Sequence, residues 1–241
     1  MGTYYSGTRD SRFIVIAEER YVSLRQNHPS LDHPLKYIYV NPMEIAFDAN
    51  LHKCTKENKG SKLYDICTVR NGEWDIDRAQ LGWNAIGFMA NAVYSRYCCG
   101  LDWPETEAYK RKLRVIKTGK MIDECRTEEE LRRRYKRLDD VFSNIILGGF
   151  KRQDELPSGR LEDEMFVSIG RSGQHYFASG GNHRLAIARL LRIPRIPCLV
   201  MTRHLMWQSL KDEYNVNRNQ GKNNLNDVMS LIRSRHPDIE G

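Results

Sequence analysis

The chain has 241 residues and a net charge of +7, and 29% of its residues are charged. No apolar run approaches the roughly 18 residues of a membrane span, and no basic segment leads into a long apolar one at the start, so neither a membrane partner nor a secretory signal is expected. Six cysteines without a Cys-x-x-Cys spacing argue against a zinc site or a disulfide framework and favour the cytoplasm. The adjacent Cys98 and Cys99 are expected to be buried thiols.

The N-terminal part holds one clear strand signal. Residues 36–40 alternate as a strand does, and Asn41 and Pro42 then turn the chain. Residues 12–17 fit either a strand or the start of a helix. Residues 49–62 are polar and basic, which predicts an exposed loop.

A tryptophan flanked by acids follows the turn signal at Asn71 and Gly72. Glu73 and Asp75, beside the indole of Trp74, offer carboxylates for a metal ion or a hydroxyl group in a partly dry pocket. The alternative is that Trp74 anchors a loop on the core while both acids are solvated. These two are the best candidate catalytic acids in the chain.

Helices are predicted over residues 77–98, 107–117 and 128–148. Thr127 and Glu130 form a capping box at the start of the third. The basic run at 132–137 favours a solvated helix face over a nucleic-acid footprint, because three glutamates precede three arginines by four residues.

The run Gly180-Gly181-Asn182-His183-Arg184 opens a helix after two predicted strands, 165–169 and 175–178. A buried strand at 198–201 and a helix from Thr202 are expected to follow. Glycines allow close approach of a ligand, and the first helical turn has free N–H groups and about half a positive charge. The run therefore predicts a site for a phosphate-sized anion. The alternative is that His183 caps the helix and Arg184 pairs with a surface carboxylate.

Residues 163–204 resemble the ParB/sulfiredoxin fold family. The run 177–184, the Ala-containing helix after it and the pair Ile196-Pro197 are similar to the sulfiredoxin signature, a Gly-Gly-Cys-His-Arg run before a helix and an Ile-Pro strand. Asn182 stands at the position of the nucleophilic cysteine, so sulfinic acid reduction is not expected. The resemblance implies that ATP or CTP with Mg²⁺ places its phosphates on Gly180, Gly181, Asn182, His183 and Arg184.

The resemblance also implies neighbours of this site. Lys151, Arg152 and Gln153 would reach the nucleotide from the loop after the third helix, the alternative being ordinary surface side chains. Arg203 and His204 are expected at the lip of the same cleft, because ligands favour the carboxyl ends of strands in α/β sheets.

Together these elements predict an α/β (α+β) fold in a single domain, residues 1–241. The ParB/sulfiredoxin-like core, a small mixed sheet with helices, would comprise residues 34–48 and 150–210. A mostly helical insertion would span 64–149, and a helical tail would span 211–241. The tail includes a helix at 225–235 that would dock on the domain or on a second copy, giving a homodimer.

The predicted function is a nucleotide-binding enzyme that hydrolyses or transfers a nucleotide phosphate. Arg184 would stabilise developing charge, His183 would donate a hydrogen bond or a proton, and Glu73 or Asp75 would act as a base or metal ligand. One alternative is a DNA-binding or nuclease module, although the chain shows no helix-turn-helix pattern. The other is a non-catalytic nucleotide switch.

Overall fold

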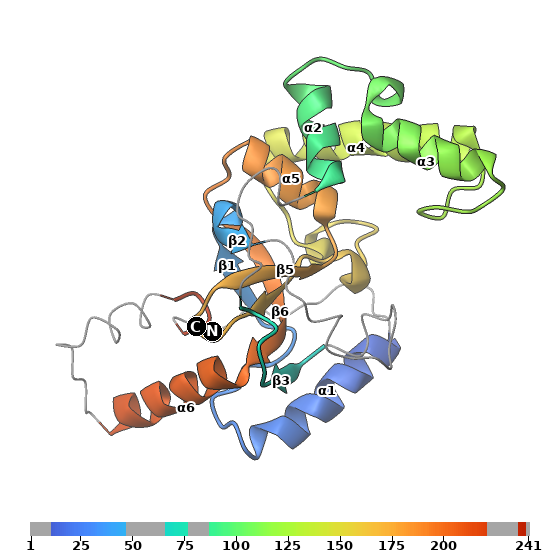
Figure 1. Cartoon of the computed structure of the whole chain (residues 1–241). Helices are drawn as coiled ribbons and strands as arrows, with labels where there is room; N and C mark the ends of the chain where they lie inside the picture. Colours follow the sequence, from blue (N-terminus) through green and yellow to red (C-terminus); the bar gives the residue numbers. More distant parts are fainter. Residues whose placement is uncertain (1–10, 47–65, 77–86, 221–235, 240–241) are drawn as a thin grey trace.

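The described part of the chain folds around a mixed, six-stranded sheet with helices on both faces (Figure 1). The computed structural model describes residues 11–46, 66–76, 87–220 and 236–239. Its helices and strands are, in chain order, α1 (Ser11–Arg25), β1 (Tyr37–Val40), β2 (Ile45–Ala46), β3 (Thr68–Arg70), α2 (Phe88–Tyr97), α3 (Glu107–Lys117), α4 (Glu128–Gly148), β4 (Phe166–Ile169), β5 (His175–Ser179), α5 (Asn182–Leu190), β6 (Ile196–His204) and α6 (Leu205–Asn219). The predicted α/β fold class is thus confirmed.

The direction of the strands defines two opposite edges of the sheet. The strand order is β1-β6-β4-β5-β2, with β3 also paired with β6. Because β3 and β4 run parallel to β6, all three end at one edge, at Arg70, Ile169 and His204, which we call the carboxyl edge. Strand β5 is antiparallel to β4, so it ends at the opposite edge and leads into α5 there. We call this the α5 edge.

Alternating side chains of the central strands build a separate core on each face of the sheet. Val167 of β4 and Cys198 of β6 pack with α5 and with Trp207 of α6. Phe166 and Leu199, one residue along each strand, point the other way and pack with α1. Both strands are buried throughout, as central strands covered on two faces should be.

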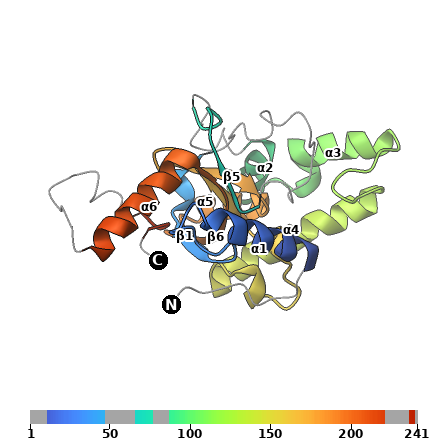
Figure 2. The same ribbon diagram turned by 90° about the horizontal axis from the view of Figure 1, so that it is seen from below.

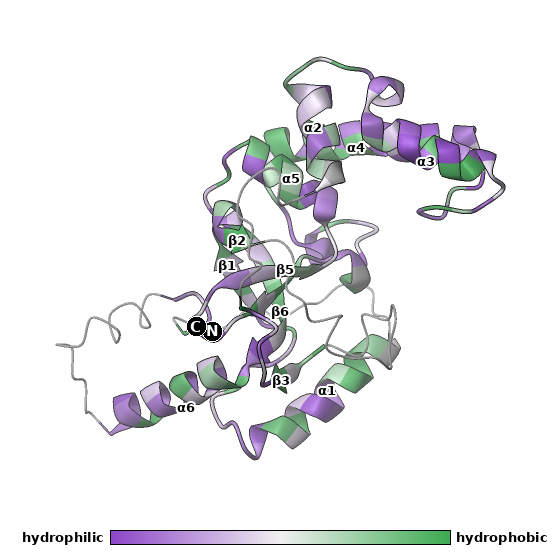
Figure 3. Ribbon diagram, viewed as in Figure 1, coloured by the Kyte–Doolittle hydropathy of each residue, from purple (hydrophilic) through white to green (hydrophobic). Residues whose placement is uncertain are grey.

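Helices α2, α3 and α4 form a layer of their own beside α5. Helices α3 and α4 lie side by side and extend away from the sheet in both views (Figures 1 and 2). Aromatic side chains fill the space between them, with Trp103, Tyr109 and Tyr135 in one cluster. Hydrophilic residues cover the outer sides of this pair (Figure 3). Helix α4 begins at the predicted capping box, in which Thr127 accepts from Glu130 N.

Several predicted elements differ from the structure. Strand β3 lies within the segment predicted to be mostly helical. Residues 12–17, for which a strand and a helix were both considered, belong to helix α1. Strand β6 continues through the predicted start of a helix at Thr202, because His204 caps α6 by accepting a hydrogen bond from Met206 N. Cys98 and Cys99 are exposed, since they follow the end of α2 and leave its buried face.

Some predictions lie outside the described residues: the loop at 49–62, residues 77–86 of the helix predicted at 77–98, and the helix at 225–235. Among the described helices, none is long and apolar enough to cross a membrane.

Candidate anion-binding site

The glycine pair before α5 is pressed against the backbone that precedes β4. Both glycines have left-handed φ angles, 68° at Gly180 and 56° at Gly181. A Cβ on Gly180 would lie 1.8 Å from the carbonyl oxygen of Glu164, and one on Gly181 would lie 2.8 Å from Met165 Cε. Packing against the backbone therefore requires glycine at Gly180, whereas at Gly181 the left-handed φ favours glycine and the end of the Met165 side chain could shift. Because Gly181 is the N-cap, no side chain caps the first-turn N–H groups of α5.

Arg184 is held by the protein itself. Its Nη1 lies 3.2 Å from Oε1 of Glu164, a fully buried carboxylate, and its Nη2 donates to the carbonyl of Lys151. The guanidinium lies 4.4 Å from the ring centroid of Phe150. Glu164 also accepts from Tyr37 Oη and from two backbone N–H groups. Arg184 thus pairs with a carboxylate, as in the alternative considered above, but the carboxylate is buried rather than at the surface.

The predicted neighbours at 151–153 do lie beside Arg184. Lys151 contacts it through a backbone carbonyl, and the N–H of Gln153 donates to Glu164 Oε2 at 2.7 Å. The guanidinium of Arg152 lies 5.1 Å from the ring of Tyr37. This segment therefore braces the Arg184–Glu164 pair, and only the exposed side chain of Lys151 is directed to solvent.

His183 belongs to a polar cluster between α3, α4 and α5, made of Lys112, Asp123, Arg134, Tyr135 and His183; we call it the interhelical cluster. Burial lowers the pKa of His183 to about 4, and the charges of Lys112 and Arg134 act in the same direction against that of Asp123. At neutral pH the imidazole is therefore uncharged.

Asp123 is the carboxylate of this cluster. Its Oδ2 lies 2.5 Å from Lys112 Nζ and 3.9 Å from Arg134 Nε. Burial works to raise the pKa of Asp123, but the hydrogen bond from Lys112 and the charges of Lys112 and Arg134 outweigh it, so the net pKa is lowered. Lys112 is buried, with its ammonium 5.3 Å from the ring centroid of Tyr135.

Four enclosed side-chain atoms around this cluster have no hydrogen-bond partner among the described residues. They are Asn182 Oδ1, His183 Nε2, Tyr109 Oη and Tyr135 Oη. Buried polar atoms are almost always paired with protein, water or a ligand. Together with the uncapped N–H groups of α5, these atoms mark a place where a polar ligand would gain hydrogen bonds.

Asp123 sits in a strained turn. Ile122 and Cys125 exchange backbone hydrogen bonds at 3.0 and 2.8 Å, and the two residues between them have positive φ, 48° at Asp123 and 64° at Glu124. Such turns favour Asn or Asp followed by Gly. A left-handed residue other than glycine costs about 1 to 3 kcal/mol, and such strain is concentrated at functional sites.

A cavity of about 240 Å³ adjoins the cluster and shares Asp123 and Arg134 with it. Its remaining lining comes from one turn and one face of α4: Glu124, Cys125, Glu130, Arg133 and Arg137. No residue of α5 lines this cavity, so it joins the interhelical cluster only through Asp123 and Arg134, where it adds Arg133 and Arg137.

The predicted acids lie elsewhere, at the carboxyl edge. Asp75 is buried and accepts from Arg171 N at 2.6 Å and Arg171 Nε at 3.0 Å. Burial would raise the pKa of Asp75, but these hydrogen bonds outweigh it and lower the pKa. Trp74 is buried and Glu73 is exposed, which agrees with the alternative that Trp74 anchors a loop on the core beside a solvated acid. Asp75 differs from that alternative, because it forms a buried ion pair.

Arg203 and His204 are also at the carboxyl edge and do not line the start of α5. Buried Arg203 pairs with Asp238, and His204 Nε2 lies 2.8 Å from the carbonyl oxygen of Gly72. A strand rises roughly 3.3 Å per residue, so the length of β4 places these residues on the order of 13 Å from the α5 edge. The single cleft expected from the sequence is thus two separate groups of residues.

Of the interhelical cluster, only His183 was a predicted site residue. Arg134 and Tyr135 belong to the basic run at 132–137, for which a solvated helix face was predicted, and Lys112 and Asp123 had no predicted role. One signal was present: Lys112 occupies a position of the buried stripe of α3, with Ala108 and Ile116 one turn before and after it. A lysine at such a position needs an anion nearby. The turn that supplies Asp123 has no comparable pattern in the sequence.

No family model, no curated protein and no solved structure matches the chain. Within the described ranges, no group of three or more His, Cys, Asp or Glu side chains is arranged to hold a metal ion.

Proposed function

We propose that the interhelical cluster and the first turn of α5 bind the phosphate group of a nucleotide, and that the protein hydrolyses or transfers that phosphate. The observation that carries the proposal is the enclosed, unpaired Nε2 of His183 beside two cations at a helix N-terminus. Backbone N–H groups, Lys112 and Arg134 are the donors that phosphate oxygens prefer. The nucleotide itself rests on the family resemblance, and the cytoplasm remains the expected compartment.

The cluster also contains groups suited to phosphoryl chemistry. A bound phosphate dianion beside His183 raises the pKa of the imidazole from its low resting value. His183 can then take the proton of a water or hydroxyl group that attacks phosphorus, while the bond to the leaving oxygen breaks. Lys112 and Arg134 stabilise the charge on the transferred group.

Mg²⁺ fits this site only as part of the nucleotide complex. It is commonly held by one or two carboxylates and the phosphates of the substrate. The interhelical cluster contains a single carboxylate, that of Asp123, so the phosphates would supply most of the ligands of the ion, which would neutralise part of their charge. Glu73 and Asp75 are at the other edge of the sheet and take no part.

The role proposed for Arg184 changes accordingly. Because it neutralises buried Glu164, it orients the entrance of α5 rather than the substrate. An alanine at this position removes the partner of a buried charge, so loss of binding in that variant would not distinguish a binding residue from a structural one.

The test is a thermal-shift panel of ATP, ADP, CTP, GTP and UTP with and without Mg²⁺, comparing wild type with His183→Gln and Lys112→Met. A ligand at about 100 times its Kd adds roughly 2.7 kcal/mol, or about 5–10 °C for a chain of this size. We expect one nucleotide to give this shift in wild type and neither variant to show it. The matched control is Lys110→Met, an exposed lysine of the same helix. Equal shifts in wild type and His183→Gln, or none in wild type, would rule out the site.

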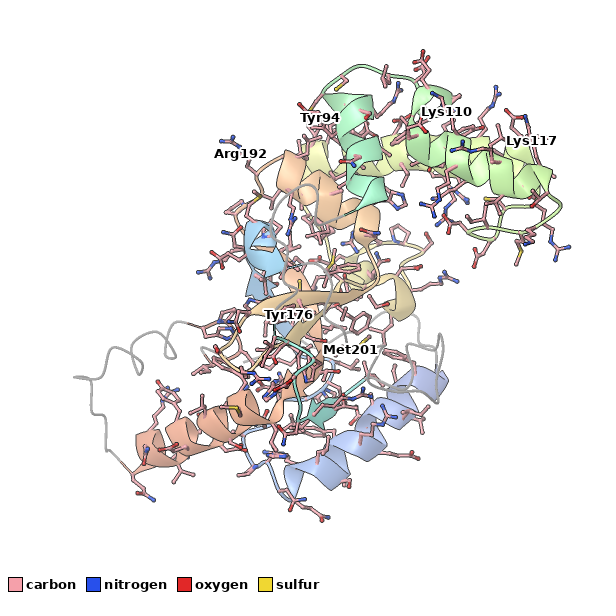
Figure 4. The ribbon with its side chains drawn as sticks, in the orientation of Figure 1. Tyr94, Lys110, Lys117, Tyr176, Arg192 and Met201 are labelled. Atoms are coloured by element: carbon pink, nitrogen blue, oxygen red, sulfur yellow. The ribbon has the colours of Figure 1, made fainter. Side chains whose placement is uncertain are left out.

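Nucleic-acid binding is a second candidate, favoured by the charge of the α3–α4 pair. Between Glu107 and Gly148 there are twelve lysines and arginines and eight acids. Lys110, Arg114 and Lys117 follow one another at helical spacing on the exposed side of α3; Figure 4 labels the first and last of these. For this function we expect the protein to bind duplex nucleic acid at low salt and to lose affinity steeply as salt is added. Changing these three residues to glutamate should abolish the binding.

A further inference from the structure

The ion pair between Lys112 and Asp123 joins a buried side chain, which is fixed in the fold, to a partly exposed one, which can move into solvent. The side chain of Lys112 is only 10% exposed, and its ammonium lies over Tyr135, whereas the side chain of Asp123 is 35% exposed. A buried ammonium requires an anion beside it. Asp123 supplies one in the structure described, at the cost of two left-handed residues in its turn.

We propose that Asp123 is an internal counter-anion, which holds Lys112 and Arg134 until a phosphate of the ligand displaces it. The inference rests on the proposed function and assigns Asp123 a specificity-determining role in it. A phosphate dianion carries more charge and more acceptor oxygens than a carboxylate, so it is the better partner for two cations and the N–H groups of α5. A weaker, singly charged anion does not displace Asp123.

The strained turn makes this exchange possible. Ile122 and Cys125, the ends of the turn, pack against the core of the α3–α4 pair, whereas Asp123 and Glu124 at its tip are exposed. The Asp123 side chain can therefore move away while the ends of the turn stay in place. Glu124 has a positive φ that glycine would adopt freely, and release of Asp123 relieves that strain. The chain thus pairs the two cations with its own carboxylate, but the strained turn binds that carboxylate only weakly.

This role predicts the opposite result from a metal ligand or a catalytic base at the same position. If Asp123 competes with the ligand, Asp123→Asn removes the competitor and tightens phosphate binding. If Asp123 holds a metal ion on the phosphate, the same change weakens Mg²⁺-dependent binding. Glu129→Gln is the matched control, because it changes the net charge equally at an exposed position in the first turn of α4.

The experiment is calorimetric titration with inorganic phosphate and with tripolyphosphate at constant ionic strength. We expect Asp123→Asn to lower both dissociation constants at least about threefold relative to wild type, and Glu129→Gln to leave them unchanged. Unchanged or weaker binding by Asp123→Asn overturns the counter-anion role. Binding that fails in wild type, in Asp123→Asn and in Glu129→Gln overturns the proposed function instead.

A second pair of variants keeps Asp123 in place, in case Asp123→Asn does not fold. Glu124→Gly and Glu124→Gln remove the same charge, but only glycine relaxes the left-handed position. The relaxed turn holds Asp123 more firmly, so we expect Glu124→Gly to bind phosphate at least about twofold more weakly than Glu124→Gln. Equal affinities in this pair contradict the displacement mechanism.

Discussion

The two edges of the sheet both bury charged side chains, but they balance them differently. At the carboxyl edge, Asp75 pairs with Arg171, and the pair Arg203 and Lys211 faces the acids Asp32 and Asp238. At the α5 edge, Lys112, Arg134 and a helix N-terminus face Asp123 alone. Lys36 also pairs with Asp32, so at the carboxyl edge three cations share two acids. In the interhelical cluster two cations share one carboxylate, which leaves more positive charge for each acid.

Unpaired atoms by themselves do not separate the two edges. Trp74 Nε1 and His175 Nε2 at the carboxyl edge also lack partners among the described residues. These atoms lie among aromatic rings, with Trp74 packed on Tyr176 and His175 stacked on His236 at 4.7 Å. At the α5 edge, His183 feels the charges of Lys112 and Arg134, and Tyr135 lies under the ammonium of Lys112. This combination of unpaired atoms and cations distinguishes a binding site from an imperfectly satisfied core.

The largest effect is expected from breaking the charge network of the carboxyl edge. Asp238 is fully buried and accepts from Arg203 and from Trp207 Nε1, with Lys211 Nζ at 3.4 Å. Asp238→Ala leaves two buried cations with less negative charge and should cost about 3–5 kcal/mol in urea unfolding. Exposed Asp140→Ala should cost almost nothing. A loss below about 1 kcal/mol for Asp238→Ala would show that the network is not what stabilises this edge.

Arg184→Ala should have the next largest effect, through stability rather than through ligand contact. It leaves Glu164 buried with three hydrogen bonds and no cation, which should cost about 2–3 kcal/mol. Exposed Arg195→Ala serves as the control. The folded variant should still bind the nucleotide, measured by calorimetry well below its melting temperature. If the variant kept its stability but no longer bound the nucleotide, Arg184 would be a ligand-binding residue rather than a structural one.

The pH dependence of stability compares the edges directly. The pKa of His175 is lowered by burial and by His236, to about 3, and that of His183 is lowered to about 4. Between those pKa values and the unfolded value of about 6.5, the unfolded chain binds more protons than the folded one. The stability present above pH 6.5 is therefore lost as the pH falls. Each group contributes a slope of about 1.4 kcal/mol per pH unit. Urea unfolding between pH 7 and 5 measures the slope.

Two variants separate these contributions. His175→Gln and His183→Gln should each remove one part of the slope. Sulfate keeps its charge over this range, and by binding next to His183 it should raise the pKa of the imidazole and flatten the slope. We expect this effect in wild type and in His175→Gln, but not in His183→Gln. An equal effect of sulfate in His183→Gln would mean that the anion binds elsewhere.

The smallest effect is expected from two tyrosine hydroxyls. Tyr37 Oη donates to Glu164 at 2.8 Å, so Tyr37→Phe should cost about 1–2 kcal/mol. Tyr135 Oη has no partner among the described residues, so Tyr135→Phe should change the stability of the ligand-free protein by less than about 0.5 kcal/mol. If its hydroxyl serves the ligand, nucleotide affinity should fall in Tyr135→Phe. A large loss of stability there would reveal a partner inside the fold.

Local signals in the sequence located most elements of this fold. The apolar runs at 165–169 and 175–178 and the capping box at Thr127 each depend on neighbouring residues, and all three were predicted correctly. Strand β3 was missed because only three residues pair with β6, and its apolar content is low.

The site was only half predictable for the same reason. The glycines and His183 lie in one short run, whereas Lys112, Asp123 and Arg134 come from two helices and a turn that only tertiary packing places beside them. Arg184 was given a ligand-binding role because nothing near it in sequence shows that Glu164 lies opposite. The periodicity of apolar residues does not predict charge pairs between distant segments.

Strand β6 imposes an order on folding. It pairs with β1, β3 and β4, yet it is the last of the described strands. Segment 37–40 cannot find its partner until residues 196–199 have been synthesised, and such distant pairings form slowly because a long loop must close first. Until then β1 and the apolar face of α1 lack their main packing surface. We therefore expect a nascent chain stalled before β6 to expose apolar surface and to depend on chaperones, more than its modest size would suggest.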